Sequence, residues 1–145
     1  TMAALREALR AAPVPVLQKL AVDITPSLFR NDYSGEARGA GERWADALAK
    51  PRMTALPSFL VRVYRGAFNA EDADELTRAM QDANVAQAAL VFATADPVLP
   101  DVREKLTGVP WIIDRDGLIN LMVNANIGVT SRVYEARYVD PAYFR

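Results

Sequence analysis

The sequence contains neither cysteine nor histidine. Without cysteine, the chain forms no disulfide and no thiolate metal site. Without histidine, it lacks the commonest general base and the commonest ligand of transition metals, and its serine and threonine hydroxyls lack a histidine to activate them. Any bound metal ion would therefore be a hard cation such as Mg²⁺, held by carboxylates.

Long apolar runs and targeting signals are missing as well. No run approaches the roughly 20 apolar residues that span a bilayer, and no signal-peptide pattern is present. We therefore expect a cytoplasmic protein without a membrane partner. The chain has 145 residues, of which 51% are hydrophobic and 24% charged, and this composition is typical of one globular domain.

Lysine is scarce, because 14 of the 17 basic residues are arginine. The net charge of −1 argues against a strongly basic nucleic-acid binder. Between residues 30 and 65, however, seven basic residues stand against four acidic ones. This local excess fits either a phosphate-facing patch or an arginine-rich face exposed to solvent, and composition leaves both interpretations open.

The amino-terminal part predicts two helices and then becomes irregular. Residues 2–12 and 16–24 have helical spacing and propensity, and the second helix is expected to end near Pro26. Residues 31–53 show weak periodicity. Part of that segment is expected to be helical, because Trp44 and Leu48 are four residues apart.

From Pro57 onward the pattern is regular and alternates strands with helices. Asn69 is a predicted helix N-cap with Asp72 at the third helical position, and Asp114 is expected to cap a later helix. We expect three strands, at residues 58–64, 86–95 and 109–114. A short helix at residues 100–106 lies between the second and the third, and residues 132–139 add an edge strand or arm.

This βαβ series predicts an α/β fold with a three-layer α/β/α core around a mixed, mainly parallel sheet. We expect a single domain over residues 1–145, with helices and an irregular segment in 1–56 and the βαβ core and carboxyl-terminal arm in 57–145. Function gathers at the carboxyl ends of the strands in such sheets. Those ends are Tyr64–Gly66, Ala93–Asp96 and Asp114, so these residues are expected at one rim.

A series of short patterns runs through the last 55 or so residues. They are "VFAT" at residues 91–94, Ile113–Asp114 followed by Leu118, Leu121 and Met122, "IGV" at residues 127–129, and Asp140 with Tyr143 and Phe144. In order and spacing this segment resembles the end of the Mrr family of restriction endonucleases, within the PD-(D/E)XK nuclease superfamily. The resemblance implies a restriction-endonuclease-like fold.

The same resemblance implies where an active site would lie. In that family, a strand carries a Gln-x-Lys or Glu-x-Lys pair followed by a basic residue, and a "GTGDGGID" signature precedes it. The lysine organises the attacking water, and an aspartate holds Mg²⁺. On "FLVRVYRG" the glutamine falls on Arg62, the lysine on Tyr64 and the basic residue on Arg65, while "GAGERWAD" places Glu42 and Asp46 at the acidic positions.

The resemblance therefore makes Asp46, Arg62 and Tyr64 vestigial catalytic positions. A guanidinium in place of a metal ligand would repel Mg²⁺, and a phenol with an ordinary pKa near 10 can only hydrogen-bond to a water. The first hypothesis is thus an inactive nuclease domain without a cofactor, kept for binding DNA or protein. Its DNA contacts would come from Arg38, Arg43, Arg62 and Arg65.

Two alternatives stay open at this stage. One is an active Mg²⁺-dependent endonuclease that uses Asp46 and Glu42 as metal ligands and Arg65 as a migrated basic residue. The other is a protein-interaction or homodimerisation module. In that module the tail, with Tyr134, Tyr138, Tyr143 and Phe144, would pack either on a partner subunit or across its own sheet.

Overall fold

The computed structural model describes residues 2–30, 32–131 and 137–145. It begins with two helices, α1 (Met2–Ala11) and α2 (Val14–Leu28). α2 runs through Pro26 to Leu28, so it ends beyond the proline where the sequence predicts its end. Pro26 cannot donate a hydrogen bond to the carbonyl of Val22, one turn earlier, but this loss does not stop the helix.

The expected helix within residues 31–53 is wrong, because this segment forms two strands. β1 (Tyr33–Ala40) and β2 (Trp44–Pro51) pair antiparallel, and β2 pairs antiparallel with β3 (Phe59–Tyr64) on its other side. The spacing of four between Trp44 and Leu48 places both on one face of a strand as well as on one face of a helix. Pairing with two neighbouring strands then overrides the helix propensity of the alanines in β2.

The βαβ series is confirmed. α3 (Ala70–Ala83) connects β3 to the parallel strand β4 (Ala88–Phe92), and α4 (Pro100–Glu104) connects β4 to β5 (Trp111–Ile113), which is also parallel. Asn69 caps α3 in a capping box with Asp72. Asp114 accepts a hydrogen bond from the Gly117 amide at the start of α5 (Arg115–Asn124), so both predicted caps are confirmed.

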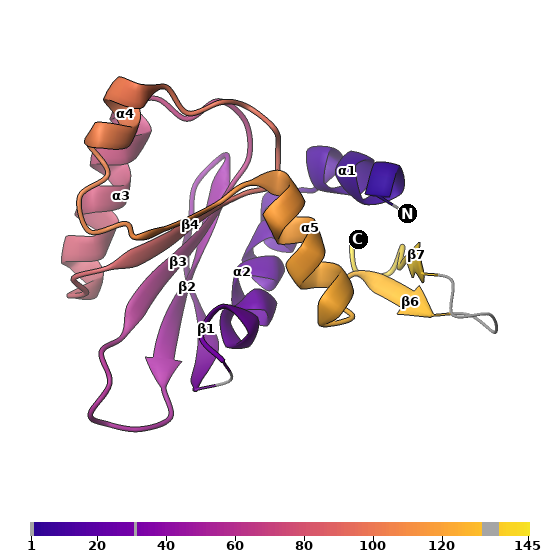
Figure 1. Cartoon of the computed structure of the whole chain (residues 1–145), viewed down its shortest axis with the longest axis horizontal. Coiled ribbons are helices and arrows are strands. Elements are labelled where there is room, and N and C mark those ends of the chain that lie inside the picture. Colours follow the sequence, from indigo (N-terminus) through magenta and orange to yellow (C-terminus); the bar gives the residue numbers. More distant parts are fainter. Residues whose placement is uncertain (1, 31, 132–136) are drawn as a thin grey trace.

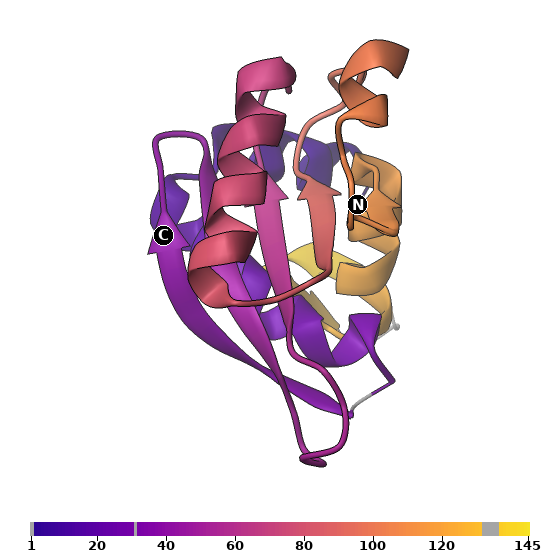
Figure 2. The ribbon, with the colours of Figure 1, turned by 90° about the vertical axis from the view of Figure 1, so that its left-hand side faces the viewer.

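The five strands form one mixed sheet in the order β1-β2-β3-β4-β5, half of whose pairings are parallel. Helices lie on both faces of this sheet, with α3 and α4 on one side and α2 and α5 on the other (Figures 1 and 2). Each face has its own apolar core. The chain is therefore a mixed α/β structure whose central strands are buried on both sides.

The two faces of the sheet differ in how closely their helices approach. Ala45, Ala47 and Ala49 of β2 face α2, and a Cβ placed on Gly35 would lie 2.5 Å from the Val22 carbonyl oxygen. These small side chains let α2 pack close to β1 and β2. The opposite face of β2 presents Trp44 and Asp46, which are larger and lie toward α3.

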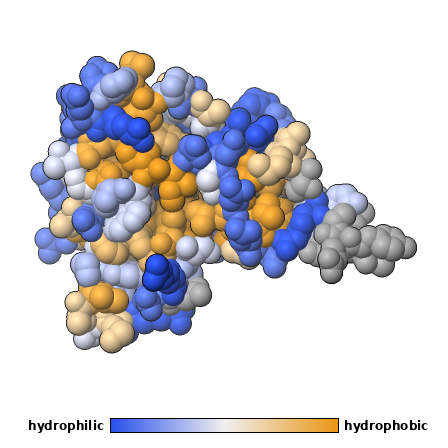
Figure 3. Space-filling model, in the orientation of Figure 1, coloured by the Kyte–Doolittle hydropathy of each residue, from blue (hydrophilic) through white to orange (hydrophobic). Residues whose placement is uncertain are grey.

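β5 is an edge strand, and its three residues are half-buried. Figure 3 shows hydrophobic surface on this side of the molecule, between α4 and α5, where β5 runs. β5 is shorter than the other strands of the sheet, and Pro110 precedes it. A short edge next to proline discourages pairing with another chain.

The carboxyl-terminal segment does not join the main sheet within the described residues. β6 (Val129–Ser131) and β7 (Arg137–Val139) pair with each other, and residues 132–136, including Tyr134, lie outside the part described. The tail then returns to α2 of its own chain. There the Tyr143 hydroxyl donates to Asp23 at 2.9 Å, and the Lys19 ammonium lies 3.9 Å from the Tyr143 ring centre.

Within residues 2–30, 32–131 and 137–145, none of the helices is both long and apolar enough to cross a membrane.

Candidate functional site

A buried ion pair joins the two strands that the sequence marks as the candidate site. Asp46 of β2 lies directly opposite Arg62 of β3 in the antiparallel register. The Arg62 Nε and Nη2 atoms donate to the two carboxylate oxygens of Asp46 at 2.8 and 2.9 Å. Asp46 is 2% exposed and Arg62 is fully buried. The fork geometry satisfies both carboxylate oxygens with one guanidinium, which is the strong form of this interaction.

An aromatic ring holds the same guanidinium from another side. The Arg62 Cζ atom lies 3.6 Å from the centre of the Trp44 ring, within the range of a cation–π contact. The indole in turn packs against Gly41, where an added Cβ would lie 2.4 Å from Nε1. Glycine at position 41 therefore lets Trp44 occupy its place over Arg62.

Burial sets the electrostatics of the pair. Desolvation raises the pKa of the Asp46 carboxyl above its ordinary value, and the hydrogen bonds and charge of Arg62 oppose this rise only in part. The carboxylate thus depends on Arg62 for most of the stabilisation that water would otherwise supply. A second cation would have to compete with a guanidinium that already engages both oxygens.

Tyr64 lies on the same face of β3, two residues beyond Arg62, but it does not join the ion pair. Its side chain packs in an aromatic cluster with Phe68 and Phe92, and its hydroxyl is buried without a hydrogen-bond partner among the described residues. Burial, and secondarily the nearby Asp72 carboxylate, raise the pKa of Tyr64. The phenol is therefore neutral.

The four arginines predicted to contact DNA have different surroundings. Arg62 is buried in the ion pair, so in this structure it presents no guanidinium to a phosphate, and that part of the prediction requires correction. Arg65 is partly buried and donates to the Ala12 carbonyl between α1 and α2. Arg38 and Arg43 are the exposed members of the set.

Both exposed arginines have local partners. Arg38 donates from Nη2 to the Asp82 carbonyl at the end of α3, at 3.1 Å. Arg43, in the turn between β1 and β2, donates to the Ala67 carbonyl at 3.3 Å and lies 3.6 Å from Asp72. Since each of these contacts is at the surface, solvent and ligands can compete for them.

The predicted metal ligands are placed apart from any carboxylate cluster. Glu42 is exposed in the β1–β2 turn, whereas Asp46 is buried and bound to Arg62. The described part of the chain holds no group of three or more aspartate or glutamate side chains that could bind a metal ion. Mg²⁺ also fits this donor set poorly, because its best carboxylate already faces a fixed positive charge.

A cavity of about 490 Å³ lies beside the ion pair, and its lining includes Asp46 and Trp44. Its other charged residues are Arg38, Glu75 and Asp82. The Glu75 carboxylate forms an ion pair with Arg78, whose Nη2 atom lies 3.0 Å from Glu75 Oε2. Since Asp46 is paired with Arg62 and Glu75 with Arg78, Arg38 and Asp82 are the remaining charged residues of this lining.

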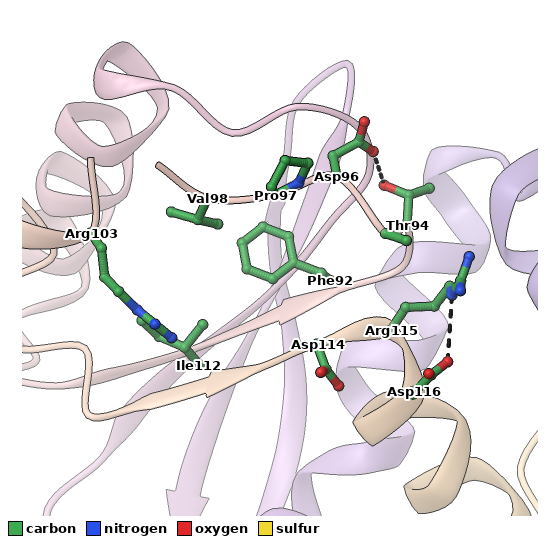
Figure 4. Close-up of a pocket in the computed structure, with 11 residues that line it drawn as sticks. Phe92, Thr94, Asp96, Pro97, Val98, Arg103, Ile112, Asp114, Arg115 and Asp116 are labelled. Carbon is green, nitrogen blue, oxygen red and sulfur yellow. Dashed lines mark hydrogen bonds and ion pairs between the residues drawn. The ribbon is translucent and has the colours of Figure 1, made fainter. Parts of the chain in front are cut away.

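The strand ends that the sequence places at one rim do meet there. The Gly66 amide donates to the Thr94 hydroxyl at 2.8 Å, and that hydroxyl donates to Asp96 at 2.8 Å. A second cavity, of about 290 Å³, is lined by Thr94, Asp96 and Asp114 together with Phe92 and others (Figure 4). The rim therefore carries an open cavity that is separate from the closed ion-pair site.

Sequence reasoning missed several residues of these two places. The sequence pattern places Trp44 on a helix face, and it gives no role to Arg103 or Arg115, which line the rim cavity. The parallel strand order gives a signal for Arg115, because it directly follows Asp114 at the end of a strand. Nothing in the local sequence brings Arg103 of α4 to the rim.

Comparison with known proteins finds no family model and no curated protein that matches this chain.

Proposed function

We propose that the chain is a nuclease-like domain that does not hydrolyse phosphodiester bonds and that acts by binding. The observation that carries this proposal is the Asp46–Arg62 ion pair. Where a nuclease of the Mrr type would hold a cation between a carboxylate and its neighbouring strand, a guanidinium supplies a permanent positive charge. Phosphodiester hydrolysis needs a cation that can accept the oxygens of the reacting phosphate, and a buried arginine offers no open position.

The arrangement of helices and strands supports a relationship to the restriction-endonuclease-like nucleases. A meander of three antiparallel strands leads into two parallel crossovers, and helices lie on both faces of the sheet. These features agree with a three-layer, restriction-endonuclease-like core. Asp46 and Arg62, which the resemblance places at the acidic position and at the first position of the Gln-x-Lys pair, also meet at facing register positions.

DNA is the proposed ligand, through phosphate contacts from Arg38 and Arg43. These two arginines are exposed and both belong to the β1–β2 hairpin. Two phosphate contacts would give a weak, sequence-independent complex, with a slope of about −2 in a plot of log K against log salt concentration. The net charge of −1 is consistent with weak rather than tight binding.

Two assays test the proposal. Incubation of the protein with methylated and unmethylated plasmid, in Mg²⁺ or Mn²⁺, should leave both plasmids intact. Cleavage by the wild type that is lost in Asp46→Ala would instead establish the active endonuclease. Isothermal titration of the wild type with Mn²⁺ should give no saturable heat.

Fluorescence anisotropy with a labelled duplex tests the binding. The double variant Arg38→Gln/Arg43→Gln should lose most of the salt-dependent affinity. Arg52→Gln is the matched control, since Arg52 is also exposed but follows the opposite end of β2. Binding that is undetectable at low salt, or that is equally reduced in the control, would contradict DNA binding through this hairpin.

A further inference from the structure

The rim cavity of about 290 Å³ lies outside the ion-pair site, since neither Asp46 nor Arg62 lines it. It opens where the chain leaves the parallel strands β4 and β5, the end at which α/β sheets bind ligands. Phe92, Val98 and Ile112 supply an apolar wall (Figure 4). The volume suits a small organic molecule, at the lower limit of about 300 Å³ for such pockets.

Opposite charges stand at the two ends of this cavity. Arg103 of α4 lies at one end, and Asp96 and Asp114 lie toward the other, with the Phe92 ring between them (Figure 4). Asp96 accepts a hydrogen bond from the Thr94 hydroxyl at 2.8 Å, and Asp114 accepts one from the Gly117 amide at 2.7 Å. Each of these bonds uses one oxygen of its carboxylate.

None of these three charged side chains is neutralised by the part of the chain that the structure describes. Arg103, Asp96 and Asp114 form no ion pair with a described residue, whereas the neighbouring Arg115 and Asp116 lie 3.6 Å apart and offset each other. The cavity therefore has a free cation at one end and free anions at the other, separated by an apolar surface.

We propose that this cavity binds a small amphoteric molecule that carries an anionic group at one end, a cationic group at the other and a flat apolar body between them. Its carboxylate pairs with the Arg103 guanidinium, which recognises planar oxyanions through two parallel hydrogen bonds. Its ammonium group pairs with the Asp114 carboxylate. The body lies against Phe92 and Ile112, where it displaces water from apolar surface.

The test uses three probes that differ only at their ends: para-aminomethylbenzoate, benzoate and benzylamine. Each is titrated into isotopically labelled protein, and the amide signals of residues 94–96, 98 and 112–116 are followed by NMR. We expect para-aminomethylbenzoate to bind at least about tenfold more tightly than either single-ended probe, because only it satisfies both ends of the cavity.

Two variants that each remove one charge distinguish the two ends of the cavity. Arg103→Gln should abolish the preference for para-aminomethylbenzoate over benzylamine, because these two probes differ in the carboxylate. It should keep the preference for para-aminomethylbenzoate over benzoate. Asp114→Asn should reduce the preference over benzoate, and it retains a good helix N-cap residue, so the fold is preserved. Arg78→Gln on α3, which does not line the cavity, serves as the control and should change neither preference.

Three outcomes would overturn the proposal: no saturable shifts, equal affinity for the three probes, or shifts confined to residues outside the cavity. None of these results bears on the Asp46–Arg62 site, because the variants leave it intact. Conversely, plasmid cleavage by the wild type would refute the proposed function and leave this binding site untouched.

Discussion

Asp46 and Arg62 face each other across β2 and β3 and share two hydrogen bonds of 2.8 and 2.9 Å inside the protein. Sixteen residues separate them in the sequence, and the antiparallel register brings them together. Both side chains are almost completely shielded from solvent. Such a pair compensates the desolvation of each charge only while both partners are present.

The first prediction follows from this dependence. Arg62→Met leaves the Asp46 carboxylate buried without its partner, and we expect it to lower the free energy of unfolding by about 3 to 5 kcal/mol. The double variant Asp46→Leu/Arg62→Met removes both charges, and its stability should be close to that of the wild type or above it. Urea unfolding followed by circular dichroism measures both values. A single variant no less stable than the double would show that Asp46 does not need Arg62.

A second prediction compares two tyrosine hydroxyls. The Tyr64 hydroxyl is buried without a partner among the described residues, whereas the Tyr143 hydroxyl donates to Asp23 at 2.9 Å. Tyr64→Phe should therefore leave stability unchanged or raise it, since it removes an unsatisfied polar group. Tyr143→Phe should cost about 0.5 to 1.5 kcal/mol. The pair is compared by urea unfolding at neutral pH, and the opposite ranking would mean that the Tyr64 hydroxyl is stabilised by the nearby Asp72 carboxylate.

The second half of the sheet was predictable because its signals are local. The capping box of Asn69 and Asp72 and the apolar run that becomes β4 each specify an element within a few residues. β2 carries no such signal. Trp44 and Leu48 fit a helix and a strand equally well, and the choice is made by pairing with β1 and β3, which a local pattern does not report.

The candidate site was predictable as a set of residues but not as an arrangement. The sequence indicates both Asp46 and Arg62 as vestigial catalytic positions, and it also predicts Arg62 as a phosphate contact and Asp46 as a metal ligand of an active enzyme. Their register makes them partners instead, and it buries Arg62. Burial of an arginine follows from the position of its strand in the middle of the sheet and from the helix above it, and neither is visible in the local sequence.

A third prediction concerns the approach of α2 to β1. A Cβ on Gly35 would lie 2.5 Å from the Val22 carbonyl oxygen and 2.9 Å from Val22 Cα, and backbone atoms cannot yield as a flexible side chain can. Gly35→Ala should therefore destabilise the protein by about 1 to 3 kcal/mol. Gly39→Ala in the same strand is the control, because its nearest neighbour would be 4.0 Å away. It should change stability by less than about 0.5 kcal/mol, and equal losses in both variants would exclude this close contact as the cause.

The fourth prediction is a loss of stability in alkali that depends on buried phenols. Burial raises the pKa of Tyr64 and of Tyr143, and Asp72 and Asp23 respectively add to the rise. In the unfolded chain both phenols ionise near pH 10. Above that pH the unfolded state binds fewer protons than the folded state, so the free energy of unfolding decreases as pH rises. Below it the two states bind the same number of phenolic protons, and no pH dependence from these residues is expected.

Urea unfolding at a series of pH values between about 8 and 11 measures this slope. Tyr64→Phe and Tyr143→Phe should each make the alkaline decrease shallower, because each removes one proton from the linkage. Tyr138→Phe is the matched control, since Tyr138 is 45% exposed, whereas Tyr64 is buried. If the slope is the same in the wild type and in all three variants, the buried phenols do not control alkaline unfolding. In that case another group must release its proton when the chain unfolds.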